Sequence, residues 1–169
     1  MTLPRLLRLA LLGGVAAALV RCADSAPLEP NAGLIGSVLE PTGLLRCAPL
    51  PSDSVTQTIG PDGGTLYVGA HRLSVPAGAL SEPVTITAVA PTDTVNQVRF
   101  QPEGLTFLRP TSLTMSYANC NILGSLVPKR IAYTSDALVI LEYLASLDNL
   151  LSRTVTGQVQ HFSTYAIAW

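Results

Sequence analysis

The stretch Val84-Thr85-Ile86-Thr87-Ala88-Val89 decides the fold class, because apolar and threonine side chains alternate along it. Successive side chains of a strand point to opposite faces, so a period of two is typical of a strand with one buried face. β-Branched residues also favour the extended backbone. The stretch therefore predicts a strand that forms one wall of a hydrophobic core.

Short runs of the same kind lie on both sides of this stretch and are separated by turn residues. Gly60-Pro61-Asp62-Gly63-Gly64 is a strong turn, because proline presets φ and glycine admits positive φ. The expected strands cover 65–68, 72–75, 95–100, 113–117, 129–134, 138–144, 153–159 and 161–169. Short strands at this spacing predict an all-β fold, a small antiparallel β-sandwich over residues 55–169.

The sequence also predicts the local structure of four segments of this domain. Residues 76–80 interrupt the strands and are expected to form one helical turn. Residues 136–152 favour strands in their first half, with a helix as the alternative, because apolar residues recur there near a 3.6 period. Lys129-Arg130 is expected to be an ordinary pair of solvated edge charges and Pro102-Glu103-Gly104 an ordinary solvated turn, with a place in a binding surface as the alternative for both.

Residues 1–22 are expected to be an export signal rather than part of the fold. Arg5 and Arg8 precede an apolar run of twelve residues over 9–20. That run is too short for a bilayer core of roughly 30 Å, which takes about 20 helical residues. Positive charge before a short apolar run is instead the pattern of a secretory signal.

Residues 23–54 are expected to form a tether between the signal and the domain. Two apolar pairs within it, Leu34-Ile35 and Leu44-Leu45, are expected to lie on the domain surface near Cys47. Regular structure is disfavoured there by Pro27, Pro30, Pro41, Pro49 and Pro51.

Cys22 follows the apolar run after a single residue, at the place of the acylated cysteine in bacterial lipoprotein precursors. Leu19 fits the lipoprotein pattern, whereas Arg21 stands where the processing peptidase prefers a small residue. The alternative is ordinary signal cleavage downstream, for example after Ser25 or Ala26. Lipidation would place the protein on the outer or cell-surface membrane, and plain cleavage would place it in the periplasm or outside the cell. Membrane contact is expected only through a lipid on Cys22.

Cys47 and Cys120 are the two cysteines that remain beyond Cys22. An even number of cysteines in an oxidising compartment favours a disulfide, and the alternative is two buried, unpaired thiols. A bridge would tie the segment before the domain onto the domain itself. Closing a loop of this length is worth roughly 4 kcal/mol in the chain-entropy model.

Composition and charge exclude several classes of function. Charged residues make up only 12% of the chain and apolar residues 48%, which is not the composition of a disordered protein. From Cys22 onward seven Lys or Arg stand against eleven Asp or Glu, a net charge of −4. No basic cluster extends beyond Lys129-Arg130, so a nucleic-acid partner is excluded.

The chain offers little material for a metal or cofactor site. Its two histidines, His71 and His161, have no second histidine or carboxylate pair at metal-ligand spacing. Asp53, Asp62 and Asp93 are expected to be turn residues that bond to their own backbone. We therefore expect no metal and no cofactor.

Two elements near the start of the domain resemble the opening of the ZU-5 domain family. They are Ile-Gly-Pro-Asp-Gly-Gly-Thr-Leu at 59–66 and Leu-Ser-Val-Pro-Ala-Gly-Ala-Leu at 73–80. The likeness continues through Val84-Thr85-Ile86 and the pattern Phe100-x-Pro102-x-Gly104-Leu105-x-Phe107, and so covers about 57–117. The tail is similar to bacterial exported ZU-5-like proteins, which often end in His-Phe-Ser-x-Tyr-Ala. The resemblance implies a β-sandwich used as a structural or interaction module, without small-molecule chemistry.

The triplet His161-Phe162-Ser163 carries the one catalytic hypothesis. It resembles the triplet at which some ZU-5-containing death-domain and inflammasome proteins cut themselves between Phe and Ser. Ser163 Oγ would attack the Phe162 carbonyl, His161 would take the proton, and water would resolve the ester. In a regular strand His161 and Ser163 share a face, but attack on the preceding carbonyl needs a strained backbone. The alternative is a hydrogen-bonded polar pair that closes the last strand.

Three functions are therefore open. The first is a non-catalytic envelope or secreted protein whose sandwich binds another envelope protein or a polymer. The second is a self-processing module cut between Phe162 and Ser163. The third is a carbohydrate-binding sandwich, which needs exposed aromatic rings, and the chain has one Trp and five Tyr.

Overall fold

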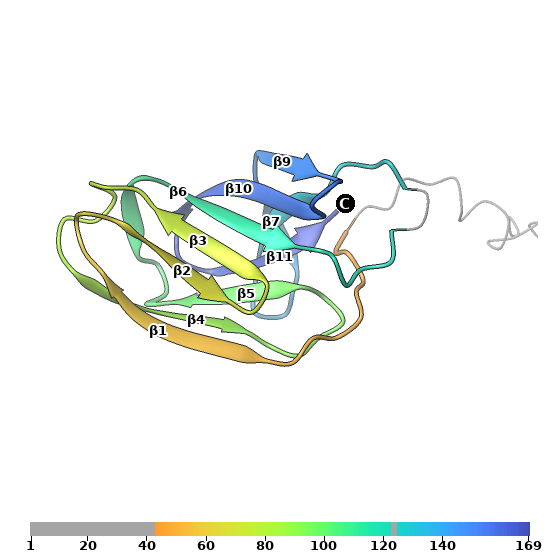
Figure 1. Cartoon of the computed structure of the whole chain (residues 1–169), viewed down its shortest axis with the longest axis horizontal. Helices are drawn as coiled ribbons and strands as arrows, with labels where there is room; N and C mark the ends of the chain where they lie inside the picture. Colours follow the sequence, from red (N-terminus) through yellow and green to blue (C-terminus); the bar gives the residue numbers. More distant parts are fainter. Residues whose placement is uncertain (1–42, 123–124) are drawn as a thin grey trace, which may run out of the picture. The chain divides into compact units, whose positions relative to one another are not determined.

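Two antiparallel sheets pack face to face in the computed structural model, which describes residues 43–122 and 125–169 (Figure 1). The described residues contain no helix, and hence none long and apolar enough to cross a membrane. The small antiparallel β-sandwich expected from the sequence is confirmed. The signal at 1–22, Cys22, Leu34-Ile35 and the tether as far as residue 42 lie outside the described residues.

The strands divide between a six-stranded and a five-stranded sheet, and every neighbouring pair is antiparallel. The first has the order β1 (Asp53–Ile59), β4 (Val84–Ala90), β5 (Gln97–Gln101), β11 (Thr164–Ala168), β7 (Arg130–Thr134) and β8 (Ile140–Tyr143). The second has the order β2 (Gly64–Val68), β3 (His71–Val75), β6 (Thr106–Ser116), β10 (Thr154–His161) and β9 (Ser146–Asn149).

The alternating stretch at 84–89 forms most of β4 and behaves as its pattern predicts. Ile86 and Ala88 are fully buried, whereas Thr85 and Thr87 lie on the other face of the sheet. Their hydroxyls pair with Thr58 and Thr56 of β1 at 3.0 and 2.9 Å. Such cross-strand hydroxyl pairs support the register that keeps the apolar side chains inside.

Two local expectations are wrong. Residues 76–80 form a β-turn, not a helical turn, with the Ala79 N–H donating to the Pro76 carbonyl at 3.1 Å. Gly78 has a φ of 75°, outside the range of a right-handed helix. The helical alternative for 136–152 is also wrong, because β8 and β9 occupy that segment.

The strand expected at 113–117 is longer than predicted, since β6 already begins at Thr106 and contains Pro110. Proline has no N–H to give to a neighbouring strand. The pairing of β6 with β10 is interrupted at this place, where the register shifts between Val159 and His161. Pro110 therefore sits in an irregular part of the ladder, which explains how a proline is accommodated within β6.

Leu45 belongs to the core, and its expected place on the surface is wrong. Its side chain is 1% exposed, and its N–H donates to the Ile167 carbonyl at 2.8 Å. β5 pairs with β11 only over Thr164, Tyr165 and Ala166, so the end of β11 has an open side. The segment before β1 fills that side, with Leu44 bridging to Ala168.

His71, at the start of β3, gives the domain a pH-dependent stability. Its Nδ1 accepts a hydrogen bond from the Ser116 N–H at 3.2 Å, and burial lowers its pKa to about 4. An unfolded histidine has a pKa of about 6.5. Between these values the unfolded chain binds the proton better, so the stabilisation is complete above pH 6.5 and declines as the pH falls towards 4.

As the pH falls from 6.5 to 4, the depressed pKa of His71 is expected to lower the free energy of unfolding by up to about 3 kcal/mol. The variant His71→Asn keeps a hydrogen-bond acceptor but does not titrate. Urea denaturation of the wild type and of this variant at several pH values therefore separates the contribution of His71 to stability from those of the carboxylates. The variant should show the shallower pH dependence. Parallel curves for the two proteins would contradict the assignment.

Candidate functional site

The triplet His161-Phe162-Ser163 lies where the chain crosses from one sheet to the other. β10 of the five-stranded sheet ends at His161, and β11 of the six-stranded sheet begins at Thr164. Phe162 and Ser163 form the connection, outside any regular strand. The strand alternation that would place His161 and Ser163 on one face therefore does not hold here.

Phe162 anchors this connection in the core. Its ring stacks on Phe100 with centroids 5.1 Å apart and meets Phe107 edge-on at 5.0 Å. Its N–H donates to the Leu105 carbonyl at 2.8 Å, and its carbonyl accepts from the Gly104 N–H at 3.0 Å. Both backbone polar groups are thus satisfied inside the sandwich, as buried peptide groups require.

His161 and Ser163 face different surroundings. The His161 ring packs edge-on against Tyr133 at 5.1 Å, and it lines a hollow with Glu142. Ser163 lines another hollow, beside Arg99 and other residues of β5 and the β7–β8 turn. The described residues show no hydrogen bond between the His161 ring and the Ser163 hydroxyl. The structure therefore does not bring the hypothetical base and nucleophile together.

The predicted disulfide between Cys47 and Cys120 is present. It fastens the segment before β1 to the loop after β6, and backbone hydrogen bonds support the same junction. Cys47 N–H donates to the Thr94 carbonyl at 2.8 Å, and Ala48 N–H donates to the Asn119 carbonyl at 3.0 Å. Disulfides of this structural kind persist in oxidising compartments.

Lys129 is fully buried, so its expected role as a solvated edge charge is wrong. Its ammonium lies over the ring of Trp169, 4.2 Å from the centroid, and donates to the Val127 carbonyl. Burial lowers the pKa of Lys129, and the Asp148 carboxylate opposes that shift. Asp148 also accepts from the Tyr117 hydroxyl at 2.5 Å. Burial raises the pKa of Tyr117, and this hydrogen bond raises it further. These groups form a closed polar cluster, and we assign it a structural role.

No family model matches the chain, and no curated protein matches it at a significant level. The likeness to ZU-5 domains stays a prediction. The surface of the domain is therefore the remaining guide to function.

The β8–β9 side carries most of the exposed large apolar side chains of the described residues. We call β8, β9 and the Leu144-Ala145 link between them the β8–β9 edge, since β8 ends one sheet and β9 ends the other. β9 lies at the margin of the sandwich in Figure 1. Five of nine such side chains belong to this edge and its flanking loops: Val139, Leu141, Leu147, Leu150 and Leu151.

This edge carries little charge, although its two strands are only four residues long each. Edge strands offer unpaired N–H and C=O groups, which natural proteins commonly guard with charged side chains or proline. Glu142 is the only exposed charged residue in the two strands, because the carboxylate of Asp148 is bonded to Tyr117 and to the Lys129 N–H. The leucines of the β8–β9 edge remain in contact with water, and Leu147 is 80% exposed.

This surface was not predicted from the sequence, although the sequence contains a signal of it. Leu138-Val139-Ile140-Leu141 is a run of four apolar residues, where a half-buried strand would alternate. Such a run is also typical of a strand buried on both faces. The sequence does not show that β8 is the last strand of its sheet, and so does not show that part of the run stays exposed.

Proposed function

We propose that this chain is an exported, non-catalytic binding module whose β8–β9 edge accepts an extended segment of another envelope protein. The exposed apolar side chains of this edge carry the proposal, because a partner strand would pair with the outer backbone groups while covering Val139, Leu141 and Leu147. The basic and apolar start of the sequence and the Cys47–Cys120 disulfide support export. A lipid on Cys22 would hold the module at a membrane, and plain cleavage would release it.

The two other functions have weaker support. Self-cleavage would need His161 to approach Ser163, and these side chains line separate hollows. A sugar platform would need several exposed rings, and Tyr67 is the only exposed aromatic residue in the described part of the chain. We therefore retain binding of a protein segment as the proposal.

A photo-crosslinking amino acid at position 147 tests the proposed surface in cells of the native host. We expect it to capture one discrete envelope partner, whereas the same label at Thr56, on the opposite edge strand β1, captures none. A second substitution, Leu141→Lys, should abolish the capture and change the unfolding free energy by less than about 0.5 kcal/mol, since the side chain is exposed. Equal labelling from positions 147 and 56 would contradict the proposal, as would the absence of any partner.

A further inference from the structure

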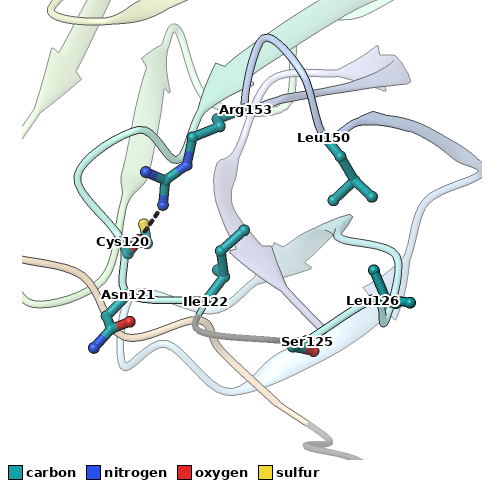
Figure 2. Close-up of a pocket in the computed structure, with 7 residues that line it drawn as sticks. All are labelled: Cys120, Asn121, Ile122, Ser125, Leu126, Leu150 and Arg153. Atoms are coloured by element: carbon teal, nitrogen blue, oxygen red, sulfur yellow. Dashed lines mark hydrogen bonds between the residues drawn. The ribbon is translucent and has the colours of Figure 1, made fainter.

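A hollow beside the disulfide combines one cation with apolar walls. Its volume is about 490 Å³, within the range of about 300–1,000 Å³ that is usual for small-molecule sites. Figure 2 shows the guanidinium of Arg153 on one side, Leu126 and Leu150 on the other, and Ile122 between them. We propose that this hollow binds a small amphiphilic anion, with its acidic head on Arg153 and its alkyl chain on the leucines.

Arg153 has the hydrogen-bonding capacity for such a head group. One terminal nitrogen donates to the Cys120 carbonyl, a bond drawn in Figure 2. The Nε atom is buried and has no hydrogen-bond partner among the described residues. The only ion pair among the described residues joins Arg99 to Asp136, so none of the described carboxylates neutralises Arg153.

An anion would pair with the Arg153 guanidinium, which has no acidic partner among the described residues. A buried donor without a partner costs about 1–3 kcal/mol, and more when it is charged. The guanidinium fork matches the oxygens of a carboxylate or phosphate better than any other side chain does. The Arg153 guanidinium, which no described carboxylate neutralises, is therefore the group to which an acidic head would bind.

The backbone gives a second, independent sign. Arg153 has a φ of 53°, in the left-handed region that side-chain-bearing residues rarely adopt. The conformation is held in place because the Arg153 carbonyl accepts the Tyr117 N–H at 2.8 Å. Strain of this kind gathers at ligand sites. Glycine would adopt this backbone with less strain.

The apolar side chains that line the hollow favour an amphiphile over an inorganic anion. Leu126 is 80% exposed and Leu150 is 43% exposed, although both line the same hollow as the guanidinium. Covering these leucines with an alkyl chain would remove apolar surface from water at about 25 cal/mol per Å². This site goes beyond the proposed function, because it takes a small ligand and uses neither the backbone of β8 nor that of β9.

Calorimetric titration of the oxidised protein with decanoate, below its micelle concentration, tests the site. We expect saturable one-to-one binding, at least tenfold weaker binding of decanol and of decyltrimethylammonium, and no binding of acetate. Equal affinity for decanoate and decanol would overturn the role of Arg153. Binding of acetate as tight as that of decanoate would overturn the role of the leucines.

Variants locate the binding. Arg153→Gln should weaken decanoate binding at least tenfold. Leu126→Asp, at an exposed position where folding is not at risk, should do the same by repelling the anion. Leu147→Asp, which lies outside the hollow, should bind decanoate as the wild type does. Wild-type affinity in Leu126→Asp would contradict the assignment, even if Arg153→Gln fails to fold.

Discussion

Reduction of the Cys47–Cys120 disulfide is expected to lower the free energy of unfolding by about 4 kcal/mol. The two cysteines are 73 residues apart, so the bond removes a large closure entropy from the unfolded chain. Urea denaturation with and without a thiol reductant measures the difference. The midpoint should fall markedly after reduction, while native near-ultraviolet dichroism in the absence of urea persists.

The double variant Cys47→Ser with Cys120→Ser is the control. It should have the lower stability of the reduced wild type and should not respond to reductant. The backbone hydrogen bonds of Cys47 and Ala48 remain available to it, so the segment before β1 should keep its place. A wild-type midpoint that is the same with and without reductant would contradict the entropic role of the bond.

Replacement of Phe162 by alanine is expected to destabilise the domain by about 3–5 kcal/mol. The ring lies between Phe100 and Phe107 at the point where the chain changes sheets, so its loss leaves a cavity at the junction of the two layers. Phe162→Leu should lose less, because leucine refills part of the space. Urea denaturation with an unchanged slope measures both effects.

Ser163→Ala provides the matched control on the neighbouring residue. Its side chain is buried, but its hydroxyl makes no hydrogen bond that the described structure shows, so the substitution should destabilise the domain far less than Phe162→Ala does. A small loss in Phe162→Ala together with a large one in Ser163→Ala would contradict the account of this connection as a packing element.

The parts of the fold that follow from local patterns were predictable from the sequence. Val84 to Val89 alternates because one face of β4 is buried, and that cause acts within six residues. The turn at 60–64 follows from proline and glycine geometry. The disulfide was predictable from the number of cysteines and the expected compartment, although only the fold shows that the two cysteines lie close enough to bond.

The rest depends on neighbours that are distant in sequence. Lys129 is buried because Tyr117 and Trp169 come to it from other strands and loops, and nothing next to it indicates this. Leu45 is buried because β11 runs beyond its pairing with β5. Both facts are properties of strand order, which the alternation of side chains does not determine.

The same limit applies to the candidate sites. The triplet at 161–163 was read as one strand, whereas the chain changes sheets within it, which separates His161 from Ser163. The hollow at Arg153 was not predicted, because it joins the loop after β6 to the turn before β10. The exposed leucines of the β8–β9 edge were visible only as an apolar run, since exposure depends on which strand ends the sheet.

The intact mass of the protein purified from its native host reports in one measurement whether the chain is exported, whether the disulfide forms and whether the chain stays uncut. We expect one species that lacks the N-terminal signal, has two hydrogens fewer than its fully reduced form, and extends through Ser163 to Trp169 without a cut. A full-length mass with free thiols, or a peptide that begins at Ser163, would contradict this expectation.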